Sequence, residues 1–171
     1  MSDKMIDRLI SRLPPVRGDY LCGVAMARHT WFGVGGPADV VFCPRDADDL
    51  GAFLAACPAD IPILPVGAGS NLLVRDGGIA GVVIRLTAHM NRISHEGNIV
   101  SAETGALDGE VARYAAKAGL GGLEFLIGIP GSVGGGLAMN AGAYGSEFRD
   151  ITIRAHGFDR AGNAVRATPA E

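Results

Sequence analysis

The stretch that decides the fold is residues 61–86, IPILPVGAGSNLLVRDGGIAGVVIRL. An apolar run ending at Val66 is typical of a buried strand, and a glycine loop, GAGSN at 67–71, follows it directly. Beyond the loop, the apolar residues 72–74 and 82–84 predict two further strands. The segment therefore predicts a sheet with a glycine loop at one end.

Toward the N-terminus, the pattern indicates a crossover that enters this sheet. Residues 38–42 predict a buried strand, and Asp46 is suited to cap a helix that runs through Leu54. A strand, a helix and the strand at 61–66 in that order indicate a βαβ unit with parallel strands. Before it, residues 6–13 predict a short amphipathic helix. Asp48 and Asp49, with Asp46, are expected to complement the dipole of the second helix.

Toward the C-terminus the pattern changes to that of a second lobe. Residues 92–103 predict a β-hairpin, Asp108 is suited to cap a helix, and Gly119 is placed for a left-handed residue after its end. The tail predicts two strands joined around residues 160–163. We expect an N-terminal helix and lead-in at 1–29, a first lobe at 30–90 and a second lobe at 91–171.

The glycine loop at 67–71 could bind phosphate. Glycines let the backbone approach a pyrophosphate closely, amide N–H groups donate to its oxygens, and Ser70 and Asn71 add side-chain donors. No Gly-Lys-Ser/Thr follows, and the next residues look extended, so ordinary nucleotide-binding loops are disfavoured. A tight turn between two strands explains this loop, taken alone, equally well.

A second glycine-rich stretch, GIPGSVGGGLAMNAGAYGSE at 128–147, has glycine at seven of its twenty positions. Such a stretch can lay bare backbone against a flat ring such as isoalloxazine. The alternatives are a close approach of helix and sheet and, for Tyr144, a buried aromatic whose hydroxyl is satisfied. A third stretch, TWFGVGGPAD at 30–39, is interpreted by itself as structural.

Composition excludes several classes of protein. Hydrophobic residues make up 48% of 171, the net charge is −3 and no run of like charges occurs, which argues against disorder and against nucleic-acid binding. Three cysteines without a CxxC pair and four scattered histidines favour neither disulfides nor a metal site. No stretch suits a signal peptide or a membrane span. We therefore expect a cytoplasmic protein with no metal, membrane or protein partner.

Taken together and in order, TWFGVGGPAD, PVGAGSNLLVRDGGIAGVVIRL and GLEFLIGIPGSVGGGLAMNAGAYGSE closely resemble the MurB family of UDP-N-acetylenolpyruvoylglucosamine reductases. The resemblance runs from Thr30 to the end of the chain. It implies an α+β, two-lobed FAD-binding fold of the PCMH/vanillyl-alcohol-oxidase type. In that fold a small lobe containing a βαβ unit faces a mainly antiparallel sheet lobe with helices.

The resemblance also implies the residues of the site, with FAD between the lobes. Asn140 and Tyr144 are expected to face the substrate. The residues expected to bind FAD are Val66, Gly67, Ala68, Gly69, Ser70, Asn71, Leu72, Ile129, Pro130, Gly131, Ser132, Gly134, Gly135, Ala138 and Gly142.

The activity that the resemblance implies is the NADPH-dependent reduction of UDP-N-acetylglucosamine enolpyruvate to UDP-N-acetylmuramate, in peptidoglycan synthesis. The family's catalytic arginine, serine and glutamate have no match here and are expected beyond Glu171, with the substrate domain. We expect the chain to bind FAD weakly and to be inactive alone. The alternatives are another oxidoreductase of the same fold and a non-catalytic flavin-binding module.

Overall fold

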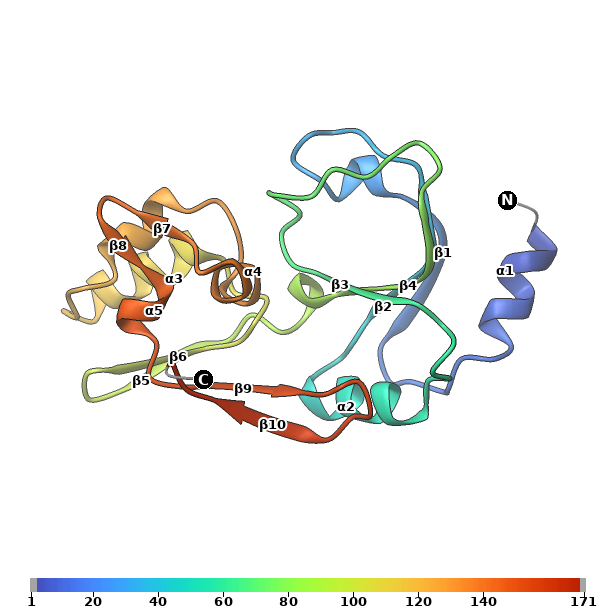
Figure 1. Cartoon of the computed structure of the whole chain (residues 1–171). Coiled ribbons are helices and arrows are strands. Elements are labelled where there is room, and N and C mark those ends of the chain that lie inside the picture. Colours follow the sequence, from blue (N-terminus) through green and yellow to red (C-terminus); the bar gives the residue numbers. More distant parts are fainter. Residues whose placement is uncertain (1–2, 170–171) are drawn as a thin grey trace.

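The computed structural model describes residues 3–169, which form two lobes (Figure 1). The first lobe is built on a four-stranded sheet in the order β1-β2-β4-β3. Strand β1 pairs antiparallel with β2, whereas β2 and β3 both run parallel to β4. The strands are β1 (Asp19–Ala25), β2 (Pro37–Cys43), β3 (Ile63–Val66) and β4 (Ile79–Arg85).

The predicted βαβ crossover is confirmed, with one strand inserted. Helix α2 (Ala47–Ala56) connects β2 to β3, and these strands are parallel, but β4 lies between them. The side chain of Asp46 caps α2 as predicted, because it accepts a hydrogen bond from the backbone N–H of Asp49 at 2.9 Å. The order strand, helix, strand predicts that β2 and β3 are parallel. It does not predict that β4, which comes later in the chain, lies between them.

The sheet carries a separate apolar cluster on each face, since successive side chains of a strand point to opposite faces. Helices α1 (Asp3–Ile10) and α2 pack on the face formed by Val40, Phe42, Val82 and Ile84, and Phe53 of α2 is fully buried there. The other face contains Val41 and Val83 and is covered by loops and by the 3₁₀ turn η1 (Met26–Arg28), whose Met26 is buried there, rather than by an α-helix. This loop-covered face lies next to the candidate site.

The second lobe surrounds a core that contains Phe125, Leu126 and Phe148. Its strands pair as two-stranded antiparallel sheets, as expected. Its elements are β5 (Ile93–Glu96), β6 (Ile99–Ala102), α3 (Asp108–Lys117), the 3₁₀ turn η3 (Glu124–Gly128), α4 (Val133–Met139), β7 (Gly142–Ala143), β8 (Ser146–Glu147) and α5 (Phe148–Ile151).

A last hairpin, β9 (Ala155–Phe158) and β10 (Ala164–Ala167), packs against α2 of the first lobe (Figure 1). The guanidinium of Arg160 donates to the carbonyl oxygens of Pro58 at 3.0 Å and Ile61 at 3.3 Å, and also to those of Leu54 and Cys57. The hairpin therefore ties the end of α2 to the tail. The predicted division of the chain at residue 90 stays a prediction.

Three local predictions were wrong. Residues 72–74 are not a strand, because they lie in the loop that brings Leu72 and Val74 onto the apolar cluster and no ladder forms there. No strand was predicted before residue 38, whereas β1 lies within 1–29. Asp108 does not cap α3: Leu107 is the residue before the helix, and neither oxygen of Asp108 accepts a hydrogen bond within residues 3–169.

Other predictions were confirmed or shifted slightly. Gly119 has the expected left-handed backbone, with φ +73°. The first helix ends at Ile10, three residues before the predicted end. A turn follows, and Leu13 packs on the same apolar cluster of the sheet as Ile10 does. Asp49 is buried, and its carboxylate accepts from the backbone N–H groups of Arg17, Gly18 and Arg45 rather than facing only the start of α2.

Candidate functional site

The two glycine-rich segments meet in the structure. The Ser70 hydroxyl donates to the carbonyl oxygen of Pro130 at 2.6 Å. A β-carbon built on Gly67 would lie 2.2 Å from Ser132 Oγ, so a side chain at residue 67 would require the Ser132 hydroxyl to move. The loop that leaves β3 therefore reaches the start of α4, on the side of the second lobe that faces the first (Figure 1).

The backbone donors of the first loop are not used by the protein. Within residues 3–169, no N–H group of residues 67–72 donates a hydrogen bond, and the same holds for Gly131 and Ser132. The carbonyl of Gly69, which has φ +68°, accepts from the N–H of Trp31 at 3.1 Å. A set of free amide donors is the arrangement that binds an anion such as a pyrophosphate.

Two buried polar side chains lie beside these donors. The hydroxyl of Ser132 and the carboxyl group of Asp108 are buried, and neither has a hydrogen-bond partner in the part of the chain that the structure describes. A β-carbon built on Gly131 would lie 3.0 Å from Asp108 Oδ2. Burial raises the pKa of Asp108 to about 6. The Ser132 hydroxyl can therefore hydrogen-bond to a ligand, and the Asp108 carboxyl group can take up a proton.

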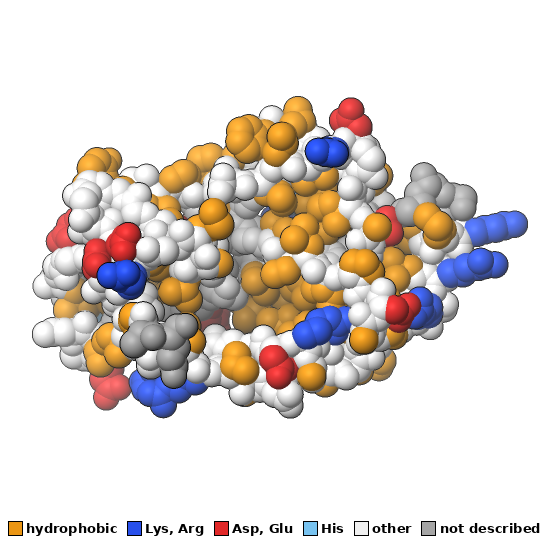
Figure 2. Space-filling model, in the orientation of Figure 1, with side chains coloured by type: hydrophobic (Ala, Val, Ile, Leu, Met, Phe, Trp, Pro, Cys, Tyr) orange, Lys and Arg blue, Asp and Glu red, His pale blue; other side chains and the backbone are white. Residues whose placement is uncertain are grey.

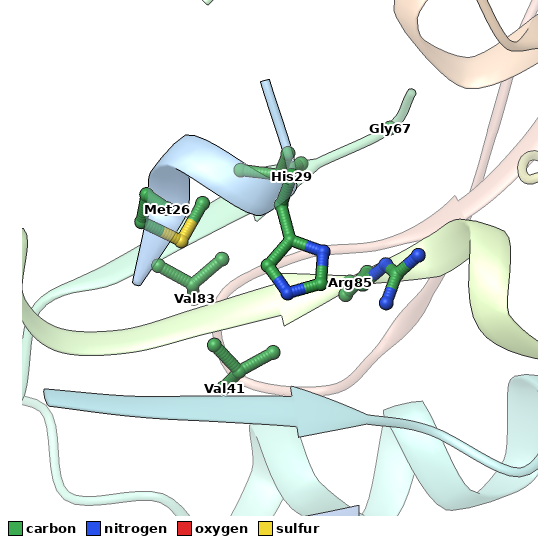
Figure 3. A pocket seen from close by; sticks show the side chains of 7 residues that line it. Met26, His29, Val41, Gly67, Val83 and Arg85 are labelled. Carbon is green, nitrogen blue, oxygen red and sulfur yellow. The ribbon is translucent and has the colours of Figure 1, made fainter. Parts of the chain in front are cut away.

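An apolar pocket adjoins the first loop on the loop-covered face of the sheet. It is lined by Met26, His29, Val41, Val66, Gly67, Val83 and Arg85, and the His29 and Arg85 side chains lie together beside its apolar residues (Figure 3). Burial, and then the cations of Arg85 and Arg28, lower the pKa of His29. Apolar side chains also gather over the first lobe beside the hollow between the lobes (Figure 2). An apolar surface with a cationic edge next to free amides suits a heterocycle linked to phosphate.

The remaining expected site residues follow α4. Ala138 and Gly142 are exposed. Asn140 follows the last residue of α4 and has a left-handed conformation. Its Oδ1 accepts from the N–H of Arg149 at 2.9 Å, so this bond links the end of α4 to α5. Tyr144 is 83% exposed with φ +54°, and its ring lies against Gly128. The structure therefore brings the loops at 67–72 and 130–132 into contact and presents Tyr144 to solvent.

Sequence reasoning missed three polar residues of the site: His29, Arg85 and Asp108. Arg85 ends β4, and ligands of parallel sheets bind beyond the carboxyl ends of their strands, so its position was a usable signal. His29 precedes the third stretch, which proves to touch the loop through Trp31 and Gly69. Asp108 gave no signal apart from its interpretation as a cap.

Neither a metal centre nor a membrane span is evident in residues 3–169. No three His, Cys, Asp or Glu side chains lie together there as metal ligands would. No helix in that range has the length and apolar character needed to cross a bilayer.

Comparison with known proteins agrees with this geometry. The model of the FAD binding domain family matches residues 38–168. The chain is 55% identical over 163 residues to a UDP-N-acetylenolpyruvoylglucosamine reductase of Parvibaculum lavamentivorans, covering 95% of this chain and 53% of that protein. It is 51% identical to the reductase of Phenylobacterium zucineum, covering 94% and 54%. The chain spans about half the length of the curated relatives it matches.

Solved structures show the same relationship. The MurB reductase of Thermus caldophilus superposes with a TM-score of 0.75 at 32% identity, over 91% of this chain and 54% of that one. Cholesterol oxidase of Brevibacterium sterolicum gives a TM-score of 0.66 at 17% identity, over 91% and 34%, which shows a shared fold alone. The two-lobed, α+β FAD-binding fold of the PCMH/vanillyl-alcohol-oxidase type is thus confirmed. The chain therefore belongs to the FAD binding domain family, and over about half of their length it is similar to UDP-N-acetylenolpyruvoylglucosamine reductases.

Proposed function

We propose that this chain holds FAD between its lobes as the FAD-binding part of an NADPH-dependent reductase. The substrate is UDP-N-acetylglucosamine enolpyruvate, the product is UDP-N-acetylmuramate, and the reaction serves peptidoglycan synthesis in the cytoplasm. The observation that carries the proposal is the Ser70–Pro130 hydrogen bond, because it joins two segments whose amide donors are otherwise free. The relatives named as this reductase support the same activity.

The residues present fit FAD. The free amides of 67–72 provide donors for a pyrophosphate, and the hydroxyl of Ser132 is a buried polar group without a partner in residues 3–169. The half-buried Arg85 supplies positive charge beside Gly67. Segment 129–135, Ala138 and Gly142 are assigned to the same cleft.

The chemistry that FAD supplies when bound is hydride transfer from NADPH to the enolpyruvyl double bond. The chain's own contribution is to bind the phosphates, orient the ring and keep water from it. We assign Tyr144 to the substrate side, because it is exposed next to the glycine-rich segment and has a backbone conformation that side chains rarely adopt. Asn140 positions the turn that carries it.

These 171 residues do not by themselves turn over substrate. Hydride addition to carbon needs a positioned acid and a group that stabilises the developing negative charge. The MurB arginine, serine and glutamate have no counterpart in matching motifs of this chain. Turnover of the enolpyruvyl substrate by this chain above a control without protein would contradict the proposal.

The first test of FAD binding is the visible spectrum of the purified chain after FAD is added and free FAD is removed. We expect a retained flavin band, and its loss in Gly69→Ala, because the new β-carbon would lie 2.1 Å from the carbonyl oxygen of His29. Gly97→Ala is the matched control: its φ is also positive, at +55°, but nothing lies within 4 Å of the added carbon. A folded wild-type chain that neither retains flavin nor changes the fluorescence of added FAD would refute the proposal.

A further inference from the structure

Asp108 is a buried acid for which the protein supplies no partner. It is the first residue of α3, its exposed fraction is 0%, and neither Oδ1 nor Oδ2 accepts a hydrogen bond within residues 3–169. A buried carboxylate without partners is strongly disfavoured relative to the neutral acid. The side chain is therefore set to change protonation when its surroundings change.

The position of Asp108 places it beneath the proposed pyrophosphate site. Its Oδ2 and the Ser70 hydroxyl lie 3.0 and 3.6 Å from one point, the position that a β-carbon on Gly131 would occupy. Ser70 and Gly131 belong to the two segments whose amide N–H groups are free. A pyrophosphate on those amides brings negative charge close to the carboxyl group, and a like charge favours the neutral acid still further.

The other charged groups near Asp108 leave it without a counter-ion. Glu110 and Arg113 of α3 are exposed. Glu124 of η3 accepts from the N–H of Gly122, and Glu103, which precedes α3, accepts from that of Arg92. Burial is the only cause that raises the pKa of Asp108, to about 6. His29, in the pocket beside Gly67, is another titratable side chain of the site, and burial followed by the cations of Arg85 and Arg28 lowers its pKa.

We propose that FAD binding is coupled to the uptake of one proton by Asp108. The inference rests on the proposed FAD function and adds a regulatory property to the same site. In the free chain the carboxyl group is ionised above about pH 6, whereas the bound chain keeps it neutral to higher pH. FAD affinity is therefore highest at and below about pH 6 and falls by up to about tenfold per pH unit above it.

The test combines two measurements on the 171-residue chain. Calorimetric titration with FAD near neutral pH, in buffers of different ionisation enthalpy, counts the protons taken up, and flavin fluorescence gives the dissociation constant from about pH 5.5 to 8. We expect an uptake approaching one proton for the wild type. We expect none for Asp108→Asn, a neutral side chain of the same shape, together with an affinity that no longer depends on pH.

Two variants identify the group that takes up the proton. His29→Gln removes the other titratable side chain of the site, and Glu110→Gln removes an exposed acid of the same helix; both are expected to keep the uptake. If Asp108→Asn does not fold, carbon NMR of labelled aspartate carboxyls in the wild type replaces it. One carboxyl is then expected to titrate near pH 6 without FAD and to stay protonated above pH 7 with it.

Three results would overturn the inference. They are FAD binding by the wild type without proton uptake, uptake that persists in Asp108→Asn, and uptake that disappears in His29→Gln. In each of them FAD still binds, so the proposed function stands. Absence of FAD binding by the folded wild type throughout the pH range refutes the proposed function and the inference with it.

Discussion

The hydroxyl oxygen of Ser70 lies 2.6 Å from the carbonyl oxygen of Pro130, sixty residues further along the chain. Ser70 belongs to the loop after β3, and Pro130 precedes α4 of the other lobe. The bond therefore fixes the separation of the two glycine segments at the point where we place the cofactor.

Ser70→Ala removes this bond and is expected to weaken FAD binding about fivefold, because a neutral hydrogen bond contributes about 1 kcal/mol. Fluorescence titration measures the change. Ser11→Ala is the control, since Ser11 also donates to a backbone carbonyl, that of Arg8, but lies near the end of α1. Equal FAD affinity in the wild type and Ser70→Ala would show that the bond does not shape the site.

Gly67→Ala is expected to destabilise the chain by about 1–3 kcal/mol and to abolish FAD retention, because the added carbon would lie 2.2 Å from Ser132 Oγ. Urea unfolding and the flavin spectrum measure the two effects. Gly77→Ala is the matched control, with nothing within 4 Å of its added carbon.

A second substitution tests the cause of that effect. Ser132→Ala removes Oγ and leaves Cβ, which lies 3.5 Å from the added carbon, at ordinary contact distance. In the Gly67→Ala background it is expected to restore most of the lost stability. Additive losses in the double variant would mean that the clash is not with the hydroxyl.

Asp49→Asn is expected to cost about 2–3 kcal/mol at neutral pH, because the amide keeps one acceptor where the carboxylate receives three backbone N–H groups. Burial raises the pKa of Asp49, but the donors from Arg17, Arg45 and Gly18 outweigh it, and the pKa lies below its ordinary value.

The sign of the pH dependence follows from this lowered pKa. The stability that Asp49 contributes is complete above the ordinary aspartate pKa of about 3.9 and is lost as the pH falls through the folded-state value. Denaturation of the wild type and of Asp49→Asn should therefore converge in acid. Asp48→Asn, an exposed neighbour, serves as control, and a difference independent of pH would contradict the assignment.

Arg160→Met is expected to loosen the last hairpin and the end of α2 together. The guanidinium donates to four backbone carbonyls there, and its loss should cost about 1–2 kcal/mol. Hydrogen exchange is expected to quicken in β9, β10 and residues 54–61. Arg166→Met removes an exposed cation from β10 and should leave exchange at α2 unchanged. Faster exchange in the hairpin alone would show that α2 does not depend on it.

The sequence predicts the parts of the fold that local patterns determine. Asp46 caps α2 and Gly119 ends α3 because each acts on its own backbone within a few residues. Residues 72–74 look like a strand because all three are apolar, but a strand also needs a partner, and the loop supplies none. Partners far away in the chain are not encoded in a local pattern.

In the candidate site, too, local patterns could be predicted and contacts between distant segments could not. The two glycine segments are recognisable from their sequence, whereas their contact depends on how the lobes pack. Asp108 looks like a cap because it precedes a helical pattern, yet its carboxyl group is turned into the protein beside Gly131. It lies against Gly131, more than twenty residues later in the chain, and no feature of its own neighbourhood indicates that.

The Arg160 clamp constrains the order in which the chain can finish folding. The carbonyls that it binds lie about a hundred residues earlier. The guanidinium cannot donate to the carbonyls at the end of α2 until the hairpin has been synthesised. Contacts of such long sequence separation slow folding, because the intervening loop must close before they form. During synthesis on the ribosome the first lobe is therefore the earlier to emerge and the later to be completed.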